Sequence, residues 1–495
     1  MNELLQHIHY FAAAQPFAEA VLTIGETSDE TTPVITSYGK LNRLILAMEE
    51  EMKRLNIRRL ALQGDNQLAW IVADLAAMKA GIATVPIPPF FKDKQTEHLL
   101  SDSACDAIFS VGSGEGFCTT WAGESNASQV VAGEYLILTN PAPTAVADFD
   151  KITYTSGSTG TPKGACLSRD TIIGTTKALH QALRAEKLQR HLCLLPFATL
   201  LENIAGIYLP LFEGRSIVVG SPKRFGLISN HFFDAEVFCR TVRDHHIESA
   251  ILLPQMLKAI VEHGDVNSLQ SLKFLAVGGG KVSTDTIHKA DELGLPIHEG
   301  YGLTECGSVV CLNTPKSTKI GTVGRPLSHV EVSISDRGEV LVSGSAMSGY
   351  LNNERTNTLI NTGDVGYLDE DGFLHITGRI KNVIVSSFGR NISPEWVEST
   401  FLADPLIQQI AVFGEAKAHL SAVIYTDTSV ETDALKRRID EINQTLPDYA
   451  QIERWLITDR AFSCEDGTLT NNGKLQRSAI YEMYFEFIDH EEDAA

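Results

Sequence analysis

Apolar and polar residues follow two different patterns along this chain. Up to about Gly321, short apolar runs typical of buried strands alternate with stretches whose apolar residues recur at helical spacing. The clearest apolar runs stand at 60–62, 83–88, 216–219, 250–253 and 274–277, and a helical pattern covers 68–79. Strands that alternate with helices predict parallel sheets with helices on their faces.

A second pattern begins near Gly321 and extends to about Ile376. Residues 331–334 and 339–342 alternate apolar and polar side chains, and the turn formers Asp336-Arg337-Gly338 separate them. This spacing predicts a β unit built from antiparallel hairpins.

A domain boundary is predicted at 378–382, because a fresh and smaller αβ region follows it. That region has a helical start at Ser393-Pro394 and an apolar run at 409–413. The predicted fold class is therefore multidomain α/β. A large N-terminal domain of doubly wound αβ subdomains with a β-rich subdomain occupies 1–377, and a small α+β C-terminal domain occupies 383–495.

Composition and charge narrow the class of protein. The chain has 495 residues, 43% of them apolar and 21% charged, which is typical of a globular protein with several domains. It has no run of eighteen apolar residues, so no transmembrane segment is expected. The N-terminus lacks the apolar segment of a signal peptide, and the eight cysteines form no C-x-x-C pair, so we expect a cytoplasmic protein with reduced thiols. The net charge of −21 argues against nucleic-acid binding.

Residues 154–164 form the most informative motif. They read Tyr-Thr-Ser-Gly-Ser-Thr-Gly-Thr-Pro-Lys-Gly and follow a short β-type run at 151–153. Glycines let backbone N–H groups approach an anion, hydroxyls donate hydrogen bonds and the lysine adds charge, so the loop predicts a polyphosphate site. It is not the common P-loop, because Pro162 stands where that pattern requires its second glycine. A flexible surface loop is the ordinary alternative, but a lysine between proline and glycine is poor linker chemistry.

Four further motifs follow in order along the chain. In Gly300-Tyr301-Gly302-Leu303-Thr304-Glu305, an aromatic ring can cover a nucleobase, and the hydroxyl and carboxylate can hold a phosphate and Mg²⁺. In Thr362-Gly363-Asp364, the carboxylate can accept hydrogen bonds from ribose hydroxyls. Gly378-Arg379 and 472–477, with Lys474, complete the set. Each of these alone is more often an ordinary turn or a solvated surface group.

Together, the order and spacing of the five motifs resemble the AMP-forming adenylating enzymes, which include acyl-CoA synthetases, adenylation domains and firefly luciferase. The resemblance extends from about residue 20 to 480 and is nearest the fatty acyl-CoA synthetase branch. It implies a site for ATP, Mg²⁺ and a carboxylic acid, with Lys474, Thr304, Glu305 and Lys163 in catalytic roles and Glu305 on the metal. It further implies nucleotide binding by Thr155, Ser156, Gly157, Ser158, Thr159, Gly160, Gly278, Gly279, Gly280, Tyr301, Gly302, Asp364 and Arg379.

The resemblance also implies a mobile C-terminal domain. In this family that domain turns about a hinge within 378–382, here at Lys381, after the acid has been adenylated. The rotation withdraws Lys474 and brings Gly389 to a channel for the incoming thiol.

The segment 195–203 bears on the substrate. It resembles the fatty-acyl pattern in keeping Glu202, but Thr199 stands where that pattern has a histidine. Ala198 and Thr199 offer no charge to pair with a substrate amine, which favours a fatty or other apolar acid over an amino acid. Coenzyme A is the expected acceptor, and the phosphopantetheine of a separate acyl carrier protein is the alternative. A nucleotide-binding protein without catalysis stays open as a different class, and a phosphotransferase is disfavoured because a Walker-type lysine–hydroxyl pair is missing.

Overall fold

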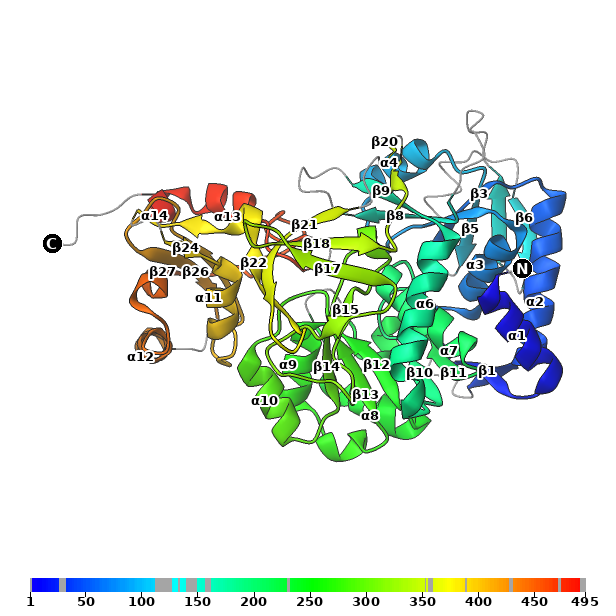
Figure 1. The fold of residues 1–495 in the computed structure, drawn as a ribbon, viewed down its shortest axis with the longest axis horizontal. Helices are drawn as coiled ribbons and strands as arrows, with labels where there is room; N and C mark the ends of the chain where they lie inside the picture. Colours follow the sequence, from blue (N-terminus) through cyan, green and yellow to red (C-terminus); the bar gives the residue numbers. More distant parts are fainter. Residues whose placement is uncertain are drawn as a thin grey trace.

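The computed structural model describes residues 2–25, 33–111, 127–131, 134–138, 149–155, 162–228, 232–351, 353–354, 359–387, 390–426, 431–470 and 473–489. They form two large sheets, a smaller antiparallel sheet and a separate C-terminal domain (Figure 1). Every helix among them is too short or too polar to span a bilayer. The predicted mixed α/β fold class is confirmed.

The first large sheet contains the strand that leads into the phosphate loop. Its strands, in spatial order, are β20 (Asn353–Glu354), β19 (Gly349–Tyr350), β9 (Lys163–Leu167), β8 (Lys151–Thr155), β4 (Ala83–Pro86), β3 (Arg59–Gly64), β5 (Ala107–Val111), β7 (Glu134–Leu138) and β6 (Ala127–Val131). Strands β8, β4, β3 and β5 run parallel, and the outer strands are antiparallel. Helix α3 (Leu68–Ala80) is buried continuously from Ala69 to Met78, since its sequence is apolar on all sides.

The second large sheet is also parallel at its centre. Its order is β16 (Arg325–Pro326), β15 (Cys311–Leu312), β14 (Ile297–Tyr301), β13 (Phe274–Val277), β12 (Ser249–Leu252), β10 (Arg190–Leu192), β11 (Ser216–Val219), β1 (Glu19–Thr23) and β2 (Val34–Ser37). The apolar runs predicted at 216–219 and 274–277 coincide with β11 and β13. Helices α8 (Ala235–His245), α9 (Pro254–His263) and α10 (Thr284–Glu292) lie beside this sheet (Figure 1).

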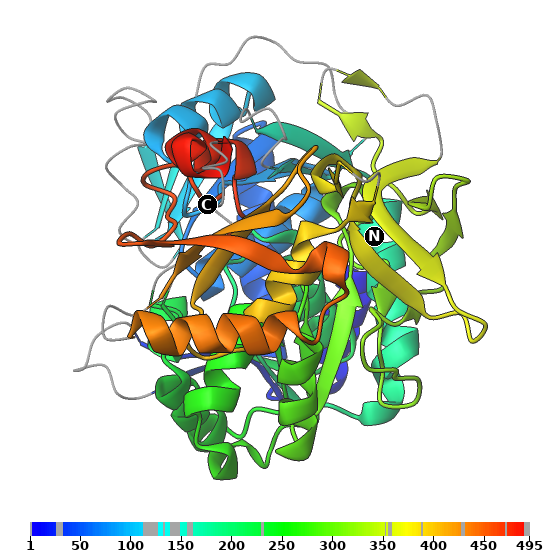
Figure 2. The same ribbon diagram turned by 90° about the vertical axis from the view of Figure 1, so that its left-hand side faces the viewer.

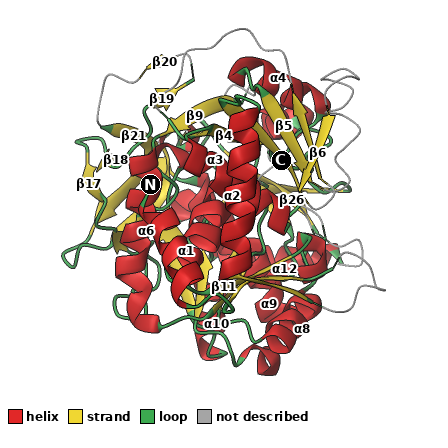
Figure 3. Cartoon of the chain, turned by 90° about the vertical axis from the view of Figure 1, so that its right-hand side faces the viewer, coloured by secondary structure: helices red, strands yellow, loops and turns green. Residues whose placement is uncertain are grey.

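Figure 3 shows the remaining α-helices of the N-terminal part from the side opposite the C-terminal domain. They are α1 (Glu3–Ala14), α2 (Tyr38–Arg54), α4 (Asp93–Ser103), α6 (Arg169–Leu183) and α7 (Leu209–Phe212), which follows a π-helix over Glu202–Tyr208. One large apolar core joins residues of α1, α2, α3 and α6 with strands of both sheets.

The predicted hairpin unit is confirmed as an antiparallel sheet. Its order is β17 (Val330–Ile334), β18 (Glu339–Gly344), β21 (Ile360–Leu368) and β22 (Leu374–Arg379). Gly338 has a φ of 77°, which a turn between two strands requires and glycine adopts without strain.

Residues after the predicted boundary form a domain with its own cores (Figure 2). Its elements are β23 (Ile384–Val385), β24 (Asn391–Ile392), α11 (Pro394–Phe401), β25 (Gln409–Phe413), β26 (Leu420–Tyr425), α12 (Thr432–Asn443), β27 (Ile452–Thr458), α13 (Arg477–Met483) and α14 (Phe485–Asp489). Ser393 caps α11 by accepting from the Trp396 N–H at 3.3 Å, as the Ser-Pro start predicts. The apolar run at 409–413 is β25.

Candidate active site

Two loops at the carboxyl ends of parallel strands begin the site. Gly278, Gly279 and Gly280 follow β13, and Tyr301 and Gly302 end and follow its neighbour β14. The loops are close, because a Cβ on Gly278 would lie 3.2 Å from the Gly300 carbonyl oxygen. Ligands of parallel sheets bind at this end of the strands, so the predicted nucleotide residues lie where the topology favours them.

Asp364 connects these loops to the antiparallel sheet. The Tyr301 hydroxyl donates to Asp364 Oδ2 at 2.6 Å, and Arg379 Nε lies 2.8 Å from Asp364 Oδ1. Arg379 stands opposite Asp364 in the pairing of β21 with β22, so the strand register itself brings the two charges together. Burial and the neighbouring carboxylate both raise the pKa of Tyr301, which keeps its hydroxyl a donor. Asp364 is 4% exposed and is fixed from two sides.

Glu305 is oriented by an aromatic residue that the sequence did not point to. Thr304 and Glu305 lie on a short 3₁₀ turn, Thr304–Cys306, and the Tyr350 hydroxyl donates to Glu305 Oε1 at 2.7 Å. The ring of Tyr350 also lies 5.9 Å from the Lys163 ammonium. Tyr350 thus links the predicted metal carboxylate to the predicted phosphate lysine.

The described ends of the phosphate motif belong to two neighbouring antiparallel strands. Thr155 ends β8, Lys163 begins β9, and the two residues are paired across the strands. The intervening predicted residues Ser156, Gly157, Ser158, Thr159 and Gly160 lie outside the described residues. The strand pairing therefore places the two described ends of the motif beside each other, next to Tyr350.

Lys474 comes from the C-terminal domain and reaches the same site. It lies on a tight turn closed by a bridge between Leu469 and Leu475, and its amide donates to Thr470 Oγ1 at 3.0 Å. The side chain remains exposed to solvent, but surrounding protein atoms and Arg379 lower the pKa of Lys474, whereas Asp364 and Glu305 act in the opposite direction. Asp364 and Glu305 belong to the N-terminal part and Arg379 ends its last strand, β22, so Lys474 lies near the predicted nucleotide residues.

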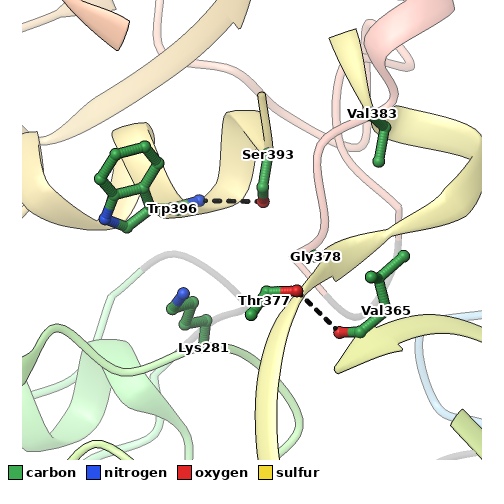
Figure 4. Close-up of a pocket in the computed structure, with 7 residues that line it drawn as sticks. All are labelled: Lys281, Val365, Thr377, Gly378, Val383, Ser393 and Trp396. Atoms are coloured by element: carbon green, nitrogen blue, oxygen red, sulfur yellow. Dashed lines mark hydrogen bonds between the residues drawn. The ribbon is translucent and has the colours of Figure 1, made fainter. Parts of the chain in front are cut away.

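A pocket of about 340 Å³ lies between the two domains beside this site. Lys281, Val365, Thr377 and Gly378 line one side, and Val383, Ser393 and Trp396 line the other (Figure 4). Lys281 also acts on half-buried Glu299, whose pKa is raised to about 8 by burial although the charge of the lysine lowers it. No sequence motif pointed to this acid. The predicted hinge residue Lys381 is exposed on the connection Ile380–Asn382, and Gly389 lies outside the described residues.

Glu202, the residue that resembled the fatty-acyl pattern, does not face the nucleotide site. It is fully buried, accepts from the Leu195 N–H at 3.1 Å and lies 3.4 Å from His191 Nε2. His191, Cys193 and Glu202 offer atoms within 4.8 Å of one another that could hold a metal, but each already has a hydrogen-bond partner in the protein. Glu202 therefore supports the π-helix and its sheet.

The donor set around Glu305 fits ATP and Mg²⁺. Mg²⁺ takes oxygen ligands and commonly uses one or two carboxylates together with substrate phosphates and water. Glu305 and the Thr304 hydroxyl supply oxygens, and Lys163 and Lys474 supply positive charge for the phosphates. Asp364 supplies the acceptors that a ribose diol needs. These residues would hold the nucleotide and its metal.

Comparisons with known proteins show which family models the sequence matches. Residues 11–351 match the family model described as AMP-binding enzyme, and residues 381–493 match the AMP-binding enzyme C-terminal domain. The chain is 26% identical to the long-chain-fatty-acid–CoA ligase FadD15 of Mycobacterium bovis, with 86% of each chain covered. It is 31% identical to the 2-succinylbenzoate–CoA ligase of Bacillus licheniformis over 54% of this chain and 57% of that protein.

Solved structures show the same fold. The o-succinylbenzoate coenzyme A synthetase of Bacillus subtilis in complex with AMP superposes with a TM-score of 0.77 at 21% identity, covering 96% of this chain and 97% of that one. The anthranilate CoA ligase AuaEII in complex with anthranoyl-AMP gives a TM-score of 0.78 at 18% identity, covering 97% and 96%.

Proposed function

Because this chain belongs to the AMP-binding enzyme family, we propose that it activates a carboxylic acid with ATP and transfers the acyl group to coenzyme A. The observation that carries the proposal is the cluster of Tyr301, Asp364 and Arg379 at the ends of the parallel strands. The charge of Lys474 is influenced by this cluster and by Glu305. A cation from one domain lies among the residues that suit a nucleotide in the other, and ligation through an adenylate needs that arrangement.

In the first step, a carboxylate oxygen of the acid attacks the α-phosphorus of ATP and pyrophosphate leaves. Two anions must approach each other, so a cation between them lowers the barrier, and Lys474 has this role in our proposal. Asp364 and Arg379 hold the ribose, Tyr301 covers the adenine, and Thr304 and Glu305 hold the α-phosphate and Mg²⁺. The lysine at the start of β9, Lys163, and the loop before it bind the leaving pyrophosphate.

In the second step, the thiol sulfur attacks the acyl carbon, AMP leaves, and the thiol proton passes to solvent or a base. In our proposal Lys474 lies beside the adenylate during the first step, so the second step requires the C-terminal domain to move. We assign 1–377 to the catalytic body, 378–382 with Lys381 to the hinge, and 383–495 to the mobile lid, with Gly389 at the thiol channel. The pocket between the domains supports this division, because a loosely packed interface can separate at little cost.

The acid is proposed to be fatty or otherwise apolar. Support comes from Ala198 and Thr199, which offer no charge for a substrate amine, and from the fatty-acid specificity in the name of one relative. Other relatives are named for 2-succinylbenzoate and ferulate, so aryl acids belong in the same test.

The test is pyrophosphate release with Mg·ATP and decanoate, 2-succinylbenzoate, ferulate or alanine, each with and without coenzyme A. Release with an apolar acid, accelerated by coenzyme A to give an acyl-CoA, supports the proposal. An acyl-adenylate that coenzyme A does not consume would point to a carrier protein as acceptor. ATP binding without release for any acid would leave a nucleotide-binding protein and refute the ligase.

A Lys474→Ala variant adds a mechanistic control. It should lose pyrophosphate release by roughly a hundredfold or more, since a charge-stabilising group of this kind contributes that much. It should still convert a supplied acyl-adenylate and coenzyme A to acyl-CoA. Loss of both steps alike would contradict the role given to this lysine.

A further inference from the structure

Lys258 makes an unusual contact across the domain interface. It lies on α9 of the N-terminal part, and its ammonium donates to three backbone carbonyls of the C-terminal domain. The distances are 2.7 Å to Leu402, 3.3 Å to Ile407 and 3.4 Å to Asp404. An ammonium has three donors, so this set uses all of them.

The three carbonyls suit a cation. Helix α11 ends at Phe401 with Leu402 as its cap, and the last carbonyls of a helix lack partners within it and carry partial negative charge. Lys258 is 23% exposed, and burial lowers its pKa, so its charge depends on these acceptors and on the nearby carboxylates Glu262 and Asp404. If the domain turned away, both sides of the contact would have to be solvated again.

The loop that Lys258 holds is rigid. Asp404 accepts from the Leu406 N–H at 2.9 Å and from Arg438 Nε of helix α12 at 2.7 Å. A restraint on the carbonyls of this loop is therefore a restraint on the C-terminal domain and not on a loose surface segment.

The same domain connects this contact to Lys474. Glu398, on α11, accepts from Arg477 Nη2 at 2.6 Å, three residues beyond Lys474. Arg477 also donates to the Val412 carbonyl at 3.0 Å, so the base of the Lys474 turn is fixed to α11 and β25. Helix α9 touches this turn as well, because a Cβ on Gly473 would lie 4.0 Å from Gln255 Nε2.

We propose that Lys258 is a positioning residue that holds the C-terminal domain in the orientation that delivers Lys474 to the nucleotide site. The expected effect on adenylation rests on the proposed function. The expected effect on the orientation of the C-terminal domain does not. Two orientations of one domain form a two-state equilibrium, and a contact made in only one of them shifts the population toward that state. Removing the ammonium therefore disfavours the adenylating orientation and leaves the other untouched.

The variant Lys258→Met keeps the apolar stem and removes the charge. Lys40→Met is its control, because Lys40 is an exposed lysine on helix α2, which lies at the far end of the molecule from the domain interface (Figure 1). The first readout is the rate of trypsin cleavage after Lys381 in the free enzyme, followed by mass spectrometry of the fragments. We expect cleavage to rise roughly tenfold in Lys258→Met and to stay at the wild-type rate in Lys40→Met.

The second readout separates the two half-reactions. ATP–pyrophosphate exchange with the acids named above should fall roughly tenfold in Lys258→Met, while acyl-CoA formation from synthetic decanoyl-adenylate should be unchanged or faster. Equal loss in both halves, or no change in either together with wild-type trypsin cleavage, overturns the inference. If the wild-type enzyme shows no exchange at all, the proposed function fails, and the trypsin readout still decides the role of Lys258. Lys258→Gln replaces the methionine variant if circular dichroism shows that the latter is unfolded.

Discussion

Replacing Lys151 by methionine tests how much stability the N-terminal part loses when a buried carboxylate has no cation beside it. Lys151 begins β8, the strand that leads into the phosphate motif, and its ammonium donates to Asp74 Oδ1 and Asn203 Oδ1, both at 2.8 Å. Both members of the ion pair are 1% exposed. Asp74 Oδ2 accepts from the Tyr208 hydroxyl at 2.5 Å and from Asn203 Nδ2 at 3.0 Å. The network therefore joins α3, β8 and the π-helix.

The expected cost follows from this geometry. Methionine fills most of the space of the lysine stem, so the cavity term is small. The main effect is that the Asp74 carboxylate stays buried without its cation, and breaking one side of such a pair costs about 3–5 kcal/mol. Burial lowers the pKa of Lys151, which shows that desolvation opposes the charge and that Asp74 offsets it. We expect the variant to lose about 3–5 kcal/mol of unfolding free energy.

Urea unfolding followed by tryptophan fluorescence measures this loss, because the Trp70 ring lies 5.9 Å from the Lys151 ammonium. The double variant Lys151→Met/Asp74→Asn removes both charges and should recover at least about half of the lost stability. A single variant within about 1 kcal/mol of the wild type would refute the reasoning, as would a double variant that loses the sum of both single changes.

Three further predictions concern the candidate site. Tyr301→Phe removes the hydroxyl that donates to Asp364 at 2.6 Å, a charge-assisted hydrogen bond worth about 1.5 kcal/mol. The variant should therefore bind ATP roughly tenfold more weakly in calorimetry. Unchanged affinity would contradict the role of Asp364. In the folded protein Glu299 keeps its proton up to about pH 8, whereas in the unfolded chain it loses the proton near pH 4.5. The unfolding free energy therefore falls as the pH rises between these two values. Glu299→Gln should reduce this fall in thermal melts between pH 5 and 8, and an equal fall would argue against a buried proton. Gly302→Ala places a Cβ 1.5 Å from the Ser308 carbonyl oxygen and should cost about 3 kcal/mol or more, with loss of nucleotide binding; a wild-type melting temperature would show that the turn can shift.

Much of the architecture could be predicted from local pattern. The apolar runs at 216–219, 274–277 and 409–413 became strands with the same limits, because each is a continuous apolar run of strand length. The alternation at 331–342 predicted an antiparallel hairpin for the same kind of reason. Asp364 and Arg379 also agree with the sequence, since each belongs to a distinctive motif and the strand register pairs them.

The contacts that the sequence did not reveal depend on tertiary structure. Tyr350 is one aromatic residue on a two-residue strand, and only the packing of β19 against β9 brings it to Glu305 and Lys163. Lys258 has the sequence context of an ordinary helical surface lysine, and its three acceptors belong to another domain. Glu202 was conspicuous for its motif, yet its carboxylate points into the interior. Local pattern cannot tell a motif that binds a ligand from one that supports the fold.

The position of the first strand has a consequence for how the chain is made. Val21 of β1 pairs with Ile217 of β11. This pairing cannot form until about 200 further residues have been synthesised. At typical ribosomal speeds the delay is roughly 10–40 s. Throughout that time the apolar β1 and the inward face of α1 are without their final neighbours, and β2 cannot yet lie at the outer edge of its sheet. We expect newly made chains to need protection by a chaperone until β11 emerges. Chains truncated before Ser216 should aggregate even though the parallel strands of the first sheet are complete.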